Sequence, residues 1–150
     1  AERQMGHVRF PCHGVGGNLL QWAVEDVGRS VDLIHSAFAI HHLSDSEKVR
    51  FLNGARRRIA HDGLLVWTDV FQEEHESRAR YLERYVARVL QWPGLTGVQR
   101  DAVIDHLQRC DWPARCGWVE SVASDSGWSL TWGWRGQHQA EALALLRPCI

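Results

Sequence analysis

The sequence predicts an α/β protein built around parallel strands. Two largely apolar runs, 31–38 and 64–71, have the length and residue types of buried strands. Between them, 44–60 has helical periodicity, and the links on either side are short. Strand, helix and strand in this order predict a right-handed crossover between parallel strands. At 150 residues, the chain is expected to be a single domain, 1–150.

The predicted helix between these strands has a clear start. Ser44 is followed three residues later by Glu47, the capping-box pattern. One apolar face is predicted from residues that recur at helical spacing: Val49, Leu52, Ala55 and Ile59. After a turn at 61–63, the run 64–71 is apolar almost throughout, which is typical of a strand covered on both faces.

Weaker signals come before the first of these strands. We predict a short strand at 7–10, a glycine-rich loop at 11–18 and a short helix at 19–28. Gly28 is well placed to end that helix.

The second half of the chain is predicted to be helical and then to return to strands. Helices are expected over 72–92, from Thr96, and from Pro113 to Gly127, so that 72–126 forms a helical insert. From 128 to 135, tryptophan and leucine alternate with small or polar residues, which predicts a strand with one buried face. Although its composition favours a helix, we interpret 140–148 as a return strand.

Composition and charge exclude several classes of protein. The formal net charge is −1, and the densest basic cluster, 56–58, fits a solvated helix face, so nucleic-acid binding is not expected. No apolar run is long enough for a bilayer and no signal peptide is visible, which predicts a cytoplasmic protein without a membrane partner. The four cysteines form no CxxC pair and are expected to be reduced thiols.

Three motifs in order resemble a known family. "VDLIHSAFAIHHL" (31–43) resembles the fourth-strand motif of class I S-adenosylmethionine-dependent methyltransferases. "EKVRFLNGARRRIAHDGLLVWTDVF" (47–71) resembles their next helix, turn and fifth strand, and "CGWVESVASDSGWSLTWGW" (116–134) their sixth-strand region. The resemblance implies a Rossmann-like sheet ordered 4-5-7-6, S-adenosylmethionine as cofactor, and methyl transfer to a small-molecule substrate.

The chain departs from this family at its cofactor-binding motif. The family's glycine-rich loop after the first strand is not found, and neither is the acidic residue that ends the second. "GVGGN" (14–18) lacks the strong preceding strand and the acidic partner that such a loop needs, so it can be an ordinary turn. In the family's order this loop follows the third strand, near the adenine, which makes Gly14 a candidate cofactor contact.

The sheet is therefore expected to lack its first two strands, as the later portion of a methyltransferase domain. That would leave the strand 31–38 as an exposed edge, which invites association. A missing upstream part, a second copy in a homo-oligomer, or a partner chain is expected to cover it.

Candidate site residues follow the two predicted parallel strands, since ligands bind beyond the carboxyl ends of such strands. Ser36, Ala37 and Phe38 close the first strand, where small residues let the cofactor approach. Asp69 closes the second, as a substrate contact or as a cap of the next helix.

Histidines follow the same strand end. His41 is the candidate general base, expected to work near neutral pH without a large pKa shift; alternatively, one of the pair packs and the other is solvated. Adjacent side chains diverge unless the backbone bends, so no metal site is expected. His42 and His106 are candidate substrate contacts, and Asp105 and Asp111 either belong to a lid or satisfy local backbone groups.

Two other functions stay open beside methyl transfer. The chain can be a non-catalytic or truncated module that keeps the half-sheet but cannot hold the cofactor alone. It can also be a histidine-dependent metal hydrolase.

Overall fold

The computed structural model describes residues 13–25 and 30–149. The helices, with one 3-10 turn (η2), are α1 (Leu19–Val24), η2 (Ile40–His42), α2 (Asp45–Arg58), α3 (Arg78–Val89), α4 (Gly97–Cys110) and α5 (Cys116–Asp125). The strands are β1 (Val31–Ala37), β2 (Ile59–Gln72), β3 (Ala114–Arg115), β4 (Trp128–Arg135) and β5 (Glu141–Pro148). The predicted α/β class is confirmed. The strand predicted at 7–10 and the end of the first predicted helix lie outside the described residues.

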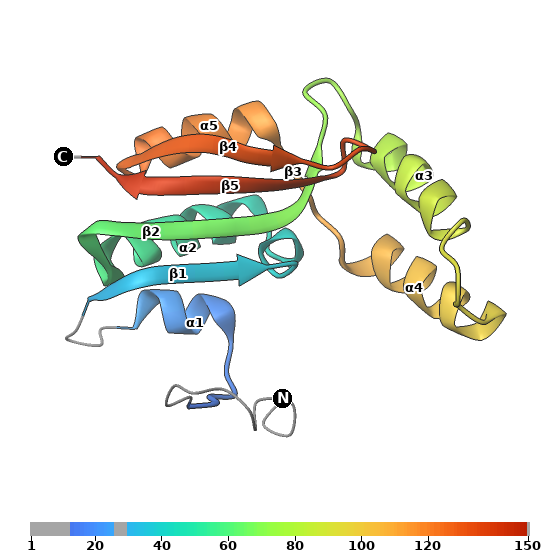
Figure 1. Cartoon of the computed structure of the whole chain (residues 1–150), viewed down its shortest axis with the longest axis horizontal. Coiled ribbons are helices and arrows are strands. Elements are labelled where there is room, and N and C mark those ends of the chain that lie inside the picture. Colours follow the sequence, from blue (N-terminus) through green and yellow to red (C-terminus); the bar gives the residue numbers. More distant parts are fainter. Residues whose placement is uncertain (1–12, 26–29, 150) are drawn as a thin grey trace.

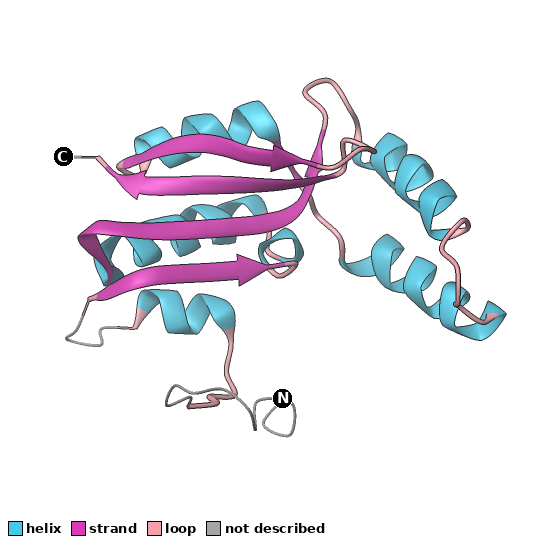
Figure 2. Cartoon of the chain, viewed as in Figure 1, coloured by secondary structure: helices cyan, strands magenta, loops and turns pink. Residues whose placement is uncertain are grey.

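Four strands form the main sheet in the order β1-β2-β5-β4. β1 and β2 are parallel, and β5 runs antiparallel to both of its neighbours. The expected order 4-5-7-6 is therefore confirmed, and so is the return strand at the end of the chain. The short β3 pairs with the end of β2. Figure 1 labels these strands, and Figure 2 shows the main sheet in magenta with the helices in cyan.

Helices α2 and α5 lie behind the same face of the sheet (Figure 1). Along β2, Leu65, Trp67 and Asp69 are buried, whereas Leu64, Val66 and Thr68 between them are half-buried. The prediction that this strand is covered on both faces is therefore wrong for most of its length, because the described helices cover one face.

The junction of α2 and β2 is tighter than predicted. The capping box of Ser44 and Glu47 is confirmed. Ile59, predicted on the helix, is instead the first residue of β2, and the predicted turn at 61–63 is an irregularity within that strand. A Cβ on Gly63 would lie 2.9 Å from the carbonyl oxygen of Asp32, so a side chain there would collide with β1.

The helical insert stands beyond one end of the sheet as a pair of helices, α3 and α4 (Figure 1). It begins later than predicted: β2 extends to Gln72, and α3 starts after its N-cap Ser77. The pair has its own apolar cluster, which includes the following buried residues: Tyr81, Tyr85, Val89 and Leu107. Residues 111–113 then lead back to β3 and the sheet.

The tryptophan strand β4 is buried at one end only. Trp128 is fully buried and Trp132 half-buried, but Trp134 is 52% exposed. The prediction of one continuous buried face is therefore wrong at Trp134. The pairing with β5 shifts register between Trp132 and Trp134, so the alternation does not continue across Gly133.

Among the described residues, β1 pairs with β2 alone and is an edge strand, as expected. Leu33, on this strand, is 59% exposed. None of the described helices is both long and apolar enough to cross a membrane. Cys110, Cys116 and Cys149 are free thiols, and Cys12 lies outside the described residues.

Candidate active site at the carboxyl end of β1 and β2

Asp69 is the centre of the polar cluster at this end of the sheet. Its side chain is completely buried on β2. Oδ2 accepts hydrogen bonds from the backbone N–H groups of Ile40 and His41, both at 3.1 Å, and from the indole N–H of Trp67 at 2.9 Å. Oδ1 accepts from the N–H of Val70 at 2.9 Å and bonds to His41 Nδ1.

Asp69 therefore positions the loop after β1. The carboxylate is buried and occupied by the chain's own donors, and contact of Asp69 with the substrate stays a prediction. Asp69 does not close its strand, since β2 continues for three more residues.

His41 lies between two carboxylates. Its ring bonds to Asp69 through Nδ1, and Nε2 lies 3.4 Å from Asp111 Oδ1. Burial alone would lower the pKa of His41, but the carboxylates of Asp111 and Asp69 outweigh burial and raise the pKa from 6.5 to about 9. The expectation of a pKa near neutrality is therefore wrong, and in this arrangement the ring holds a proton at pH 7.

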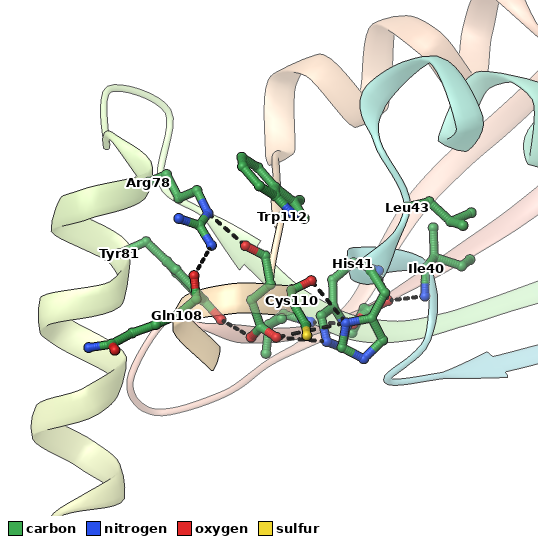
Figure 3. Close-up of polar contacts among 12 residues, drawn as sticks. Ile40, His41, Leu43, Arg78, Tyr81, Gln108, Cys110 and Trp112 are labelled. Carbon is green, nitrogen blue, oxygen red and sulfur yellow. Dashed lines mark hydrogen bonds and ion pairs between the residues drawn. The ribbon is translucent and has the colours of Figure 1, made fainter. Parts of the chain in front are cut away.

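Asp111 reaches this cluster from the far end of the helical insert. It follows α4 directly, is 1% exposed, and lies 3.5 Å from the Tyr81 hydroxyl. Arg78 holds the segment in place by donating to the backbone carbonyls of Asp111 and Gln108, both at 2.7 Å. Figure 3 shows Arg78 and Tyr81 of α3 and Gln108 of α4 on the opposite side of the cluster from His41.

A second set of contacts ties the same segment to the loop after β1. The N–H of Trp112 donates to the carbonyl of His41 at 2.8 Å. The fully buried Lys48 donates to the carbonyls of Leu43 and, at 2.7 Å, Trp112. Arg78 lies over the Trp112 ring, 4.1 Å from its centre, so the insert is fastened to the sheet at this point.

His42 and His106 come together on the accessible side of the cluster. The side chain of His42 is 36% exposed, and its ring meets that of His106 edge-on at 5.1 Å. Asp105 instead pairs with Arg109 on the same helix. A cleft of about 390 Å³ opens beside His42 and is lined by the following residues: His42, Ser44, Asp45, Glu47 and Trp112. This size is within the range of small-molecule pockets.

Of the predicted cofactor residues at the end of β1, Ser36 lies in a separate cleft. Ser36 lines a cleft of about 270 Å³ along β1, and its buried Oγ has no hydrogen-bond partner among the described residues. Phe38 adopts a left-handed φ of 50°, with its N–H held by the carbonyl of Thr68 at 2.9 Å. Ala37 is exposed and the Phe38 ring is 51% exposed.

These features fit a cofactor that approaches the strand end. An unpartnered hydroxyl and an exposed aromatic ring are groups that a nucleoside could contact. Gly14 is exposed and does not line this cleft, so the structure does not bring it together with Ser36.

The sequence did not predict the contact of Asp111 with His41, and it indicated no role for Lys48. Asp111 is expected in a lid or bonded to local backbone groups. A lysine within a predicted helix is ordinarily expected on the exposed surface of that helix. The one available signal was that Lys48 is the single lysine of the chain, within a helix whose apolar face surrounds it.

Comparison with solved structures identifies the fold. No protein-family model matches the sequence, and neither does any curated protein. CalO1, described as a methyltransferase in calicheamicin biosynthesis in an SAH-bound form, matches 90% of this chain with 34% of its own, at 16% identity and a TM-score of 0.56. An O-methyltransferase family protein from Burkholderia thailandensis is similar over 90% of this chain and 35% of its own chain, at 14% sequence identity and a TM-score of 0.56.

The chain therefore has the fold of the C-terminal part of class I S-adenosylmethionine-dependent methyltransferases, as its motifs predicted. It spans about a third of the length of these structures. A protein described as a pericyclic reaction enzyme matches 97% of the chain with 33% of its own, at 11% identity and a TM-score of 0.59. The same fold thus serves different chemistry, and function has to be argued from the site.

Proposed function

We propose that this chain takes part in S-adenosylmethionine-dependent methyl transfer to a small-molecule acceptor. The observation that carries the proposal is the His41–Asp69 pair at the carboxyl end of β1 and β2. It lies between the Ser36–Phe38 strand end and the cleft beside His42. Ligands of parallel α/β sheets bind beyond this end of the strands.

Ser36, Ala37 and Phe38 would hold one side of the cofactor. When bound, S-adenosylmethionine supplies an electrophilic methyl group on a sulfonium. The Ser36 hydroxyl offers a hydrogen bond, and the Phe38 ring offers an apolar face. Gly14 stays a proposed contact from the family resemblance alone.

His41 is the residue we propose to take the proton of the acceptor. Asp69 fixes the ring by its bond to Nδ1, which aims Nε2 away from the sheet. Asp111 faces Nε2 in this structure and favours the protonated ring, so the acceptor group must take the place of Asp111, and the Nε2 proton must leave to solvent, before His41 can act as a base. His42 and His106, at the accessible side, are proposed to contact the acceptor.

The alternative is a non-catalytic module that keeps the half-sheet. Two observations favour this alternative. The chain spans about a third of the length of the solved structures, and it shows no glycine-rich motif of the family's kind. The two readings differ in whether the purified chain forms S-adenosylhomocysteine.

The test is an assay with methyl-labelled S-adenosylmethionine and a panel of small hydroxyl acceptors, for the native chain, His41→Ala and His61→Ala. His61 is a matched control because its side chain is 90% exposed on the same strand as Asp69. We expect His41→Ala to lower turnover about 100-fold, the scale of general-base catalysis, with S-adenosylhomocysteine affinity nearly unchanged. An unchanged rate in His41→Ala removes it as the base. A native chain that neither binds the cofactor nor transfers a methyl group supports the non-catalytic module.

A further inference from the structure

The turn after β1 brings two adjacent histidine rings together. Residues 40–42 form the 3-10 turn η2, and the ring centres of His41 and His42 lie only 3.9 Å apart, tilted by 52°. The expectation that these side chains diverge is therefore wrong, because the backbone bends at this turn. One ring nitrogen of each, together with a carboxylate oxygen of Asp111, lie within 4.8 Å of one another.

Both rings are oriented by an acceptor at Nδ1. His41 Nδ1 bonds to the Asp69 carboxylate, and His42 Nδ1 lies 3.1 Å from the carbonyl oxygen of Cys110. Histidines that bind metals usually donate one ring N–H to a carboxylate or a backbone carbonyl in this way. The contact with Asp69 leaves Nε2 of His41 as the nitrogen that can coordinate a cation, whereas His42 faces Asp111 with Nδ1 itself.

Asp111 supplies an independent observation. Its Oδ1 is buried in a residue that is 1% exposed, and it accepts no hydrogen bond from any residue that the structure describes. The nearest basic atoms are His41 Nε2 at 3.4 Å and His42 Nδ1 at 3.9 Å. This buried carboxylate oxygen accepts no hydrogen bond and faces nitrogens of two histidines, so a bound metal ion could take the place of the proton on His41.

The spacing suits a small transition-metal ion. Two ligands about 2.0–2.1 Å from a tetrahedral zinc ion lie roughly 3.3 Å apart. The 3.4 Å between His41 Nε2 and Asp111 Oδ1 matches this separation. His42 is the exposed member of the set, so a fourth position would open toward the cleft beside it.

We propose that His41, His42 and Asp111 bind one divalent transition-metal ion of the zinc type, with Asp69 as the outer partner of His41. The proposal does not depend on methyl transfer. Coordination and proton abstraction use the same nitrogen of His41, so the metal-bound chain cannot use His41 as a base.

The test is a titration of the metal-free, full 150-residue chain with Co²⁺, followed by visible absorbance, and with Zn²⁺, followed by calorimetry. The variants are His42→Ala and, as a matched control, His106→Ala, which removes the ring that touches His42 without removing a ligand. Circular dichroism establishes that each variant is folded. We expect one ion per native chain and per His106→Ala chain, and at least tenfold weaker binding by His42→Ala.

Equal affinity of His42→Ala and the native chain would overturn the proposal, as would no binding by the native chain. Strong sulfur-to-cobalt charge-transfer absorbance would also overturn it, since it would place the ion on the free thiols. Each result concerns metal affinity alone, so it is separate from success or failure of the methyl-transfer assay.

Discussion

Replacing Asp69 with asparagine tests whether this carboxylate organises the site. The substitution keeps the shape of the side chain but turns one acceptor oxygen into an N–H donor. If the amide nitrogen takes the Oδ1 position, the bonds from the Val70 N–H and the His41 ring are lost. The Oδ2 position receives three N–H groups, so placing the nitrogen there would cost more.

Hydrogen bonds to a charged group contribute about 1.5–3 kcal/mol each, so losing two costs about 3–6 kcal/mol. Breaking a buried ion pair costs about 3–5 kcal/mol, which agrees with this range. No reduction for solvent screening applies, because Asp69 is 0% exposed. We therefore predict that Asp69→Asn lowers the free energy of unfolding by about 3–5 kcal/mol.

Urea unfolding followed by circular dichroism measures this loss. With a slope of about 2 kcal/mol per M, the midpoint should fall by roughly 2 M. Asp62→Asn is the matched control, the same change on the same strand at a side chain that is 78% exposed, and should stay within about 0.5 kcal/mol of the native chain. A loss below about 1 kcal/mol for Asp69→Asn would refute the role we assign to Asp69.

Two further predictions concern helix α2. A Cβ on Gly54 would lie 2.7 Å from the carbonyl carbon of Ala23, so Gly54→Ala should destabilise the chain by about 1–3 kcal/mol in urea unfolding, whereas Asn53→Ala, on the exposed side, should not. Burial lowers the pKa of Lys48 from 10.5, so the unfolded chain binds more protons than the folded chain in the window below pH 10.5. The contribution of Lys48 to the free energy of unfolding should therefore rise with pH toward 10.5, so the pH slope of the native chain should be more positive than that of Lys48→Met in this window; equal pH slopes would contradict the burial of the ammonium group.

The strands of the sheet could be predicted because their signals are local, whereas their order was implied by the resemblance to methyltransferases. Ser44 and Glu47 marked the start of α2, and the apolar runs marked β1 and β2. The extent of β2 could not be predicted, since Gln72 is polar and its place in the strand depends on pairing with Arg115, 43 residues further along the chain.

The site could be predicted only in part, because some of its contacts join residues that are far apart in the sequence. His41 and the end of β1 follow from the position of the strand. Asp111 and His41 are 70 residues apart, and their contact depends on how the α3–α4 pair folds back onto the sheet. The raised pKa of His41 follows from that contact, so no local pattern could indicate it.

The central claim is that the end of β1 is a cofactor site, and amide chemical-shift mapping during a titration with S-adenosylhomocysteine tests it most directly. We predict saturable shifts at Ser36, Ala37 and Phe38, weakened in Phe38→Ala. The same spectra show whether Gly14 responds. An absence of shifts at residues 36–38 up to saturating concentrations would contradict the account.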